Sequence, residues 1–346
     1  MTGVLWRIGE QPWLREQFGA PLMRVVIDND FAGDPDNFFQ LAHHLLSPSV
    51  DIRAVIASHL RAGDPLHPSA GSAEAGRRAA GRLAEVMHVD LAGELLRGCD
   101  DGLADCHTAR PSPAAEAIIA EAMRDEPGLA PLFVLCGGGL TDLACAWLIE
   151  PAIASRLTVI WIGGPEYEGS APGVARRPEP EYNLITDPVA AQVVLNDSDL
   201  PLWLVPRDVY RQCLVSQAQL RTRLSGCGAL GAFLLDALER RFDSARRSGR
   251  SHGETYTLGD SPLVLLTALQ SFYAPEPSSS DYVERPCPQI TEQGRFTGQN
   301  AEHPIRVYQR LDTGLMVEDM FAKFEEFARW LEAASRSESA DGASSS

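Results

Sequence analysis

The sequence has little lysine, no paired cysteine motif and no long apolar run. Its 30 basic residues include a single lysine, Lys323, and its seven cysteines form no Cys-x-x-Cys pair. No apolar run reaches about 18 residues, the length needed to cross a bilayer, and no segment resembles a signal peptide. We therefore expect reduced thiols in a cytoplasmic protein.

The composition is that of a large globular chain with a strong excess of acidic residues. Its 346 residues are 45% hydrophobic, and the formal net charge is −17. Such a charge argues against nucleic acid or an anionic membrane as the main partner. No Pro/Gly/Ser-rich linker interrupts the chain, so we expect one large domain over residues 21–333. It follows an N-terminal extension, 1–20, and precedes a Ser-rich tail, 334–346, expected to be disordered.

Apolar runs with strand character alternate with segments of helical spacing. This alternation predicts an α/β fold, a mostly parallel sheet with helices on both faces and a Rossmann-like core. After Leu214 the pattern becomes mainly helical, with a possible hairpin around 290–310. The expected strands are Leu22–Ile27, 49–58, Pro131–Cys136, Leu157–Ile162 and 201–205, and the expected helices are Phe38–Leu46, Glu74–Met87, 114–124, Leu140–Leu148, 187–196, 215–249, 261–272 and 318–333.

Four carboxylates crowd the turn after the first expected strand. Asp28, Asp30, Asp34 and Asp36 lie within nine positions. The carboxyl ends of strands are where open α/β sheets bind ligands. Because crowded carboxylates repel one another, they need a cation or shared protons. This turn is the strongest indication of chemistry in the chain.

An Asp-x-Asp after a first strand has two enzymatic interpretations. One is the aspartyl nucleophile of haloacid-dehalogenase-like phosphatases, which use a downstream cation, usually lysine, to hold the phosphate. Here the one lysine, Lys323, lies in the expected C-terminal helix, so this interpretation is disfavoured.

The second interpretation is a resemblance that covers residues 22 to about 332. Asp28-Asn29-Asp30 followed by Asp34–Asn37 resembles the Asp-x-Asp-Pro-Gly-x-Asp-Asp motif of the inosine–uridine-preferring nucleoside hydrolase superfamily. Four further segments match family motifs in the family order: Leu135–Asp142 (Gly-Gly-Leu-Thr-Asn), Ile162–Gly164 (Met-Gly-Gly), Glu181–Pro188 (Glu-Phe-Asn-x-x-x-Asp-Pro) and Leu258–Pro262 (His-Asp-Pro).

The resemblance implies an N-glycosyl hydrolase that releases ribose and a free base from ribonucleosides by means of a Ca²⁺-bound water. Asp30 would bind Ca²⁺ and orient or deprotonate the attacking water, and Asp260 would be a second carboxylate ligand. Gly137 would offer its backbone carbonyl, which suits a hard cation. Glu181 and Asn183 would hold ribose hydroxyls. The transition state would resemble a ribosyl oxocarbenium ion.

The Gly33–Asn37 segment is one residue longer than the family motif, which leaves two alignments open. Anchoring on the helix makes Asp36 the ribose-binding residue and Asn37 the metal ligand. Anchoring on Asp30 makes Asp34 and Asp36 the pair. Because a neutral Asn would weaken the hold on the ion, we favour Asp36 or Asp34 as the metal ligand. Asp34 could equally cap the following helix.

Gly259 stands where many family members carry a histidine that helps to protonate the departing base. The candidates for this role are His59, His252, Tyr210 and Tyr256. We favour His59, because it ends the second expected strand, and count Tyr256 among the substrate-binding residues. The longer loop at 165–180 carries Arg176 and Arg177, which could contact a phosphate.

The alternative function is a ribose- or nucleoside-binding paralogue of the same fold with weak turnover, for which Gly259 is the support. The resemblance implies a homodimer or homotetramer in purine or pyrimidine salvage, with a small-molecule nucleoside as partner. Two residues have simpler structural interpretations. Asp28 would support the loop, and Asp187 could only cap a helix.

Overall fold

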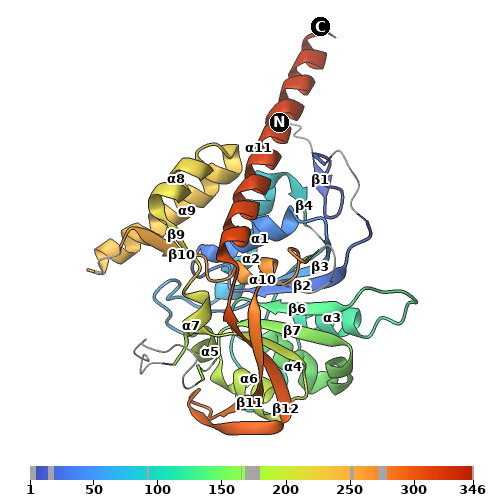
Figure 1. Ribbon diagram of the computed structural model, residues 1–346, viewed down its shortest axis with the longest axis vertical. Coiled ribbons are helices and arrows are strands. Elements are labelled where there is room, and N and C mark those ends of the chain that lie inside the picture. Colours follow the sequence, from blue (N-terminus) through green and yellow to red (C-terminus); the bar gives the residue numbers. More distant parts are fainter. Residues whose placement is uncertain are drawn as a thin grey trace.

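The computed structural model describes residues 5–14, 19–91, 93–164, 166–167, 180–249, 253–271 and 279–344, with side chains as far as residue 336. Within these residues an eight-stranded sheet runs in the order β11-β12-β8-β7-β6-β2-β3-β5 (Figure 1). Every neighbouring pair is parallel except β11 and β12. The strands are β2 (Met23–Asn29), β3 (Val50–Ala57), β5 (Leu95–Arg97), β6 (Leu132–Cys136), β7 (Leu157–Ile162), β8 (Leu202–Val205), β11 (Asp281–Ile290) and β12 (Phe296–Arg310).

Helices cover both faces of this sheet, which confirms the predicted fold class. Alternate residues of β2 show the division: Val25 and Ile27 pack in one apolar core, and Val26 packs in the other. A central parallel strand buried on both faces therefore has a continuous apolar sequence. The first core contains residues of α1 (Asp36–Leu45), α2 (Ser72–Met87), α8 (Gln217–Leu224), α9 (Gly228–Arg247), α10 (Pro262–Leu265) and α11 (Thr313–Ser344), and the second contains residues of α3 (Pro113–Ala122), α4 (Thr141–Ile149), α5 (Tyr182–Thr186) and α6 (Pro188–Gln192).

Smaller elements complete the description and correct some predicted bounds. The expected helix 187–196 is divided at Gln192, where α6 passes into a π-helical turn, Val193–Asp197. Within the described part of the expected helix 261–272, residues 261–271, the helix that forms is α10. The predicted hairpin is the longer pair β11 and β12. The remaining elements are β1 (Trp6–Arg7), β4 (Val89–Asp90), the 3₁₀ turn Pro151–Ser155, α7 (Arg207–Tyr210), β9 (Leu214–Ser216) and β10 (Thr255–Thr257).

The N-terminal extension is anchored to the last helix by aromatic side chains. The rings of Trp6 and Trp13 lie 4.9 Å apart, and Trp13 lies 5.3 Å from Phe327 of α11. The Trp6 indole N–H donates to the Met87 carbonyl over 2.7 Å. Burial of these large rings gives the short β1–β4 pairing its support.

Helix α11 extends past residue 334, where the tail was expected to begin. It continues to Ser344 and projects beyond the body of the molecule (Figure 1). Propagating a helix that tertiary packing has already nucleated fixes few dihedrals per added hydrogen bond. A polar composition alone therefore does not end this helix.

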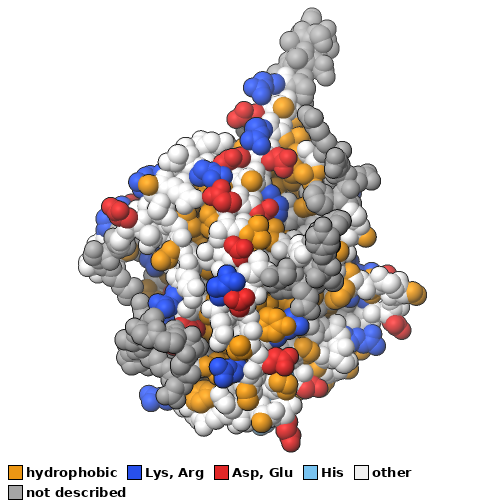
Figure 2. Space-filling model, in the orientation of Figure 1, with side chains coloured by type: hydrophobic (Ala, Val, Ile, Leu, Met, Phe, Trp, Pro, Cys, Tyr) orange, Lys and Arg blue, Asp and Glu red, His pale blue; other side chains and the backbone are white. Residues whose placement is uncertain are grey.

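The surface shows no segregation of charge on the side drawn in Figure 2. Among the side chains coloured there, acidic and basic groups are interspersed. No helix among the described residues is both long and apolar enough to cross a membrane. The acidic excess of the chain is therefore not gathered on that face.

A buried histidine on α1 makes stability depend on pH. His43 Nε2 lies 2.7 Å from Asp319 Oδ2, and burial lowers the pKa of His43 from 6.5 to about 4 despite that carboxylate. The unfolded chain therefore binds a proton at a higher pH than the native chain does. The stability that His43 contributes is present above pH 6.5 and is lost as pH falls towards 4.

We predict that His43→Gln reduces the loss of unfolding free energy between pH 7 and pH 5 by about 2 kcal/mol. Urea unfolding of both proteins at the two pH values measures this difference. His107→Gln, at an exposed histidine, is the matched control and should behave as the wild type. An equal pH dependence in wild type and His43→Gln would contradict the prediction.

Candidate active site

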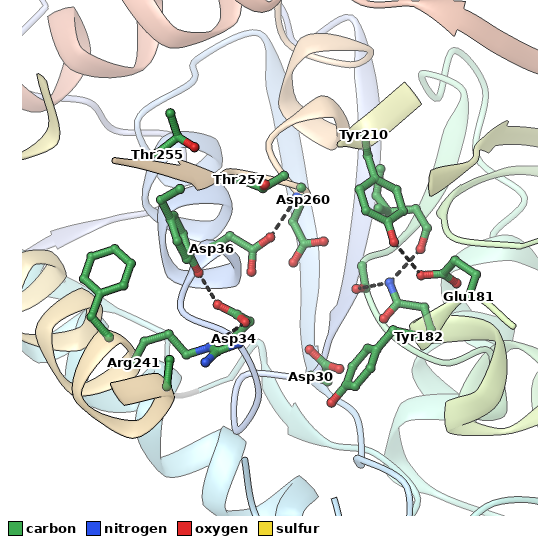
Figure 3. A pocket seen from close by; sticks show the side chains of 17 residues that line it. Asp30, Asp34, Asp36, Glu181, Tyr182, Tyr210, Arg241, Thr255, Thr257 and Asp260 are labelled. Carbon is green, nitrogen blue, oxygen red and sulfur yellow. Dashed lines mark hydrogen bonds and ion pairs between the residues drawn. The ribbon is translucent and has the colours of Figure 1, made fainter. Parts of the chain in front are cut away.

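A cavity of about 420 Å³ opens where β2, β6 and β7 end. This volume is in the range of small-molecule sites, and the carboxyl edge of the sheet is where such folds bind ligands. Figure 3 shows its side chains. The lining residues are Asp30, Asp34, Asp36, Gly137, Ile162, Glu181, Tyr182, Asn183, Tyr210, Arg241, Phe242, Ala245, Thr255, Tyr256, Thr257, Gly259 and Asp260.

The turn after β2 brings Asp30 and Asp36 to the cavity. The Gly33 N–H donates to the Asp30 carbonyl over 2.7 Å, and a Cβ at Gly33 would lie 3.0 Å from that oxygen. Glycine therefore permits the tight turn. The Asn37 side-chain amide donates to the same carbonyl over 3.0 Å, but Asn37 does not line the cavity.

Asp30 and Asp36 form an acidic wall of the cavity, and Asp260 joins this wall from the other half of the chain. Its backbone N–H donates to Asp36 Oδ2 over 3.3 Å. The Asn29 amide donates to Asp260 Oδ2 over 3.1 Å and to Gln40 Oε1 over 3.2 Å. Asn29 is thus a site residue that the sequence analysis did not identify, although it lies between two aspartates of the motif. It orients Asp260 without neutralising its charge.

Asp30, Asp36 and Asp260 resist ionisation together. Burial raises the pKa of each of the three carboxyl groups. Nearby carboxylates raise it further: those of Asp36 and Asp34 raise the pKa of Asp30, and those of Asp260 and Asp34 raise the pKa of Asp36. The carboxylate of Asp30 likewise raises the pKa of Asp260. No described lysine, arginine or histidine forms an ion pair with any of the three. At neutral pH this wall is short of positive charge.

The donor chemistry of this wall fits a hard divalent cation. All the donors are oxygens, and they include the Gly137 carbonyl, which accepts one hydrogen bond from the Asn183 amide over 2.9 Å. A carbonyl has two lone pairs, so another remains. In the described part of the chain, however, no group of three His, Cys, Asp or Glu side chains is already arranged so that it could hold a metal ion. The structure therefore contains suitable ligands but no closed ligand set.

Asp34 is turned towards a different partner from Asp36. Its Oδ2 accepts from Arg241 Nε over 2.8 Å, and its Oδ1 accepts from the Tyr256 hydroxyl. Figure 3 shows this group at one side of the cavity and Asp36 beside Asp260. Of the two alignments left open above, the geometry thus favours Asp36 as the carboxylate that shares the wall with Asp260. Arg241, on α9, belongs to none of the sequence motifs and was not predicted at the site.

Glu181 lies at the side of the cavity across from Arg241 (Figure 3), and Asn183 also lines the cavity. Glu181 Oε2 accepts from the backbone N–H of Leu184 over 2.9 Å, and Oε1 accepts from the Tyr210 hydroxyl over 2.8 Å. Burial raises the pKa of Glu181. Asn183 also donates to the Ile162 carbonyl over 2.7 Å. These contacts hold both side chains at the end of β7.

His59 does not line this cavity, which corrects the expectation that it would face the carboxylates. Its Nε2 lies 2.9 Å from Thr141 Oγ1 and its Nδ1 lies 3.0 Å from the Leu60 carbonyl. It borders a separate cavity of about 460 Å³. The strand end was the right place, but these two contacts, one of them to α4, turn the ring away from the carboxylates.

Two other aspartates lie behind the site. Asp28 is fully buried and does not line the cavity, and burial and the neighbouring Asp142 carboxylate raise its pKa. Asp187 Oδ1 accepts from the Ala190 N–H over 3.0 Å and caps α6, as expected. Its Oδ2 also accepts from Thr141. His252, Arg176 and Arg177 lie outside the described residues.

A side chain at position 259 would press on the Asp36 carboxylate. A Cβ there would lie 3.1 Å from Asp36 Oδ2 and 3.5 Å from Tyr210 Cδ2. A larger residue there would therefore require the Asp36 carboxylate, which accepts from the backbone of Asp260, to shift by a few tenths of an ångström.

The sequence matches a model of the inosine-uridine preferring nucleoside hydrolase family over residues 25–331. The enzyme of that description from Crithidia fasciculata is 40% identical over 80 residues, 23% of this chain and 24% of that protein. The one from Leishmania major is 38% identical over 104 residues, 30% of this chain and 31% of that protein. These stretches span about a quarter to a third of the curated relatives.

Solved structures share the fold over most of the chain. A purine-preferring ribonucleoside hydrolase from Gardnerella vaginalis has a TM-score of 0.68 and 16% identity, covering 88% of this chain and 99% of that one. An inosine-uridine preferring nucleoside hydrolase from Bacillus anthracis has a TM-score of 0.58 and 16% identity, with the same coverage. At this identity the likeness establishes the architecture.

We predict that Asp36→Asn stabilises the metal-free protein at pH 8 by about 1–2 kcal/mol, because it removes one charge from a repelling wall. The raised pKa means that the native state favours the protonated carboxyl. The gain should therefore shrink as pH falls towards 4. Urea unfolding in the presence of a chelator measures it. Asp125→Asn, at an exposed position, is the control, and a destabilised Asp36→Asn at pH 8 would contradict the prediction.

Proposed function

The chain belongs to the inosine-uridine preferring nucleoside hydrolase family, and we propose that it hydrolyses the N-glycosidic bond of ribonucleosides to ribose and a free base. The observation that carries this proposal is the anionic wall of Asp30, Asp36 and Asp260 in a cavity that Glu181 and Asn183 also line. Glycosidic cleavage develops positive charge on the sugar, which such a wall stabilises.

We assign Ca²⁺ to the oxygens of Asp30, Asp36, Asp260 and the Gly137 carbonyl. The support is the raised pKa of the three carboxylates and the lack of a described ion pair to them. Asp34 is left out, because Arg241 and Tyr256 already engage both of its oxygens. When bound, the cation would supply Lewis-acid polarisation of water and of the ribose hydroxyls.

We propose Asp30 as the general base. It lies on the wall of the cavity with 5% of its surface exposed, and the carboxylates around it favour uptake of a proton. In the proposed reaction Asp30 takes a proton from the attacking water, whose oxygen bonds to C1′ as the bond to the base breaks. Glu181 and Asn183 hold ribose hydroxyls, so that the sugar is fixed within attack distance.

We predict that Asp30→Asn lowers kcat for ribose release by about 10²–10⁴-fold, because it removes the general base. A reducing-sugar assay over inosine, guanosine, adenosine, uridine and cytidine measures this, with Asp125→Asn as the control. No ribose release from any of these nucleosides by the wild type with Ca²⁺ would overturn the proposed function. Nucleoside and Ca²⁺ binding without turnover would instead support the weakly active paralogue.

We predict that Ca²⁺ stabilises the protein in the absence of substrate. At 100 times its Kd it should add about 2.7 kcal/mol to the free energy of unfolding. Thermal melts with Ca²⁺ and with chelator measure the effect, and Asp260→Asn should lose most of it. A melting temperature that chelator leaves unchanged in the wild type would contradict the assignment of the cation.

A further inference from the structure

We propose that Arg241 recognises the base of a 6-oxopurine ribonucleoside and stabilises the negative charge that this base takes up as it departs. The proposal rests on the proposed function and identifies its substrate class and the group that activates the leaving base. Arg241 lines the cavity and lies on α9, 207 positions along the chain from Asp34, to which it is bonded.

The arrangement of the cavity places the base near Arg241. Glu181 lies at one side, Asp30 and Asp36 lie in the middle, and Arg241 lies at the other side (Figure 3). Asn183, whose amide donates to the Gly137 and Ile162 carbonyls, also lines the cavity. A ribose held between Glu181 and the pair Asp30 and Asp36 directs the base on its C1′ towards the side where Arg241 lies. That side has the character of a base pocket, because Phe242 and Ala245, which lie on α9 with Arg241, and Thr255, which Figure 3 shows on the same side, also line the cavity.

Asp34 holds the guanidinium of Arg241 through Nε, which leaves Nη1 and Nη2 available to a ligand. Its Nε donates to Asp34 Oδ2 over 2.8 Å, and the Tyr256 hydroxyl holds the other oxygen of Asp34. Neither Nη1 nor Nη2 of Arg241 has a hydrogen-bond partner among the described residues. About a quarter of the side chain, 27%, is exposed. The free end of the fork can therefore donate two parallel hydrogen bonds to a ligand.

A planar fork of two donors selects a base with two adjacent acceptors. A 6-oxopurine presents O6 and N7 side by side, whereas adenine presents N7 beside an amino donor. Arg241 would thus make two hydrogen bonds to hypoxanthine or guanine and one to adenine. A bidentate contact of this kind discriminates by about 10–100-fold.

The same contact accounts for departure of the base without an acid. When the C1′–N9 bond breaks, its electron pair passes to the purine, where N7 and O6 share the negative charge. The water oxygen bonds to C1′, its proton goes to Asp30, and the purine anion later takes a proton from solvent. Arginine keeps its proton and acts as a fixed cation. The three tyrosine hydroxyls of residues that line the cavity, those of Tyr182, Tyr210 and Tyr256, already donate to carboxylates.

The test compares Arg241→Gln with the wild type on inosine, adenosine, 7-deazainosine and 4-nitrophenyl β-ribofuranoside. We expect kcat/KM on inosine to fall about 10²-fold in the variant, as for loss of one charge-stabilising donor. The nitrophenyl riboside should be affected little, because nitrophenolate departs without help. The wild type should prefer inosine to adenosine by about 10–100-fold and should act more slowly on 7-deazainosine, which lacks N7.

Arg240→Gln is the matched control, since Arg240 is the adjacent residue on α9, pairs with Asp236 and does not line the cavity. It should retain wild-type rates. An equal loss on all four substrates in Arg241→Gln would overturn the proposal, because it would show a role confined to holding Asp34. So would equal wild-type rates on inosine and adenosine. In either case the wild type still releases ribose, so the failure is distinct from failure of the proposed function.

Discussion

Repulsion among Asp30, Asp36 and Asp260 is the constraint on which the rest of the site depends. Three carboxylates that raise one another's pKa at the end of a buried strand cost stability at neutral pH. The two apolar cores on either side of the sheet offset that cost. The charge that remains is available to a cation and to a sugar that becomes positive as its bond breaks.

The scaffold orients these oxygens with neutral groups. Asn29 donates to Asp260, Asn183 donates to the Gly137 carbonyl, and the backbone of Asp260 donates to Asp36. Amide donors fix positions without supplying a full positive charge, whereas an arginine would neutralise the wall. Asp34 is the contrasting case, because Arg241 pairs with it directly. Adjacent carboxylates of one motif thus have different electrostatic environments and, in our proposal, different functions.

Local patterns predicted most of the sheet, and the family resemblance supplied most of the residues expected at the cavity. Apolar runs identified β2, β3, β6, β7 and β8, since a strand buried on both faces leaves a clear signal in sequence. The three-residue strand β5 left too short a run to be identified. His59 was expected at the site because it follows a strand. Its ring direction depends instead on Thr141, 82 positions away.

The sequence by itself determined the α/β fold, the family and the polar groups at the strand ends, because these depend on short motifs and on the period of buried residues. Only the tertiary structure decided that Asp36 rather than Asp34 faces Asp260, that His59 turns away, and that Arg241 enters the cavity. The physical reason is the same in each case. The direction of a side chain is set by partners far along the chain, and Asp34 meets Arg241 across 207 positions.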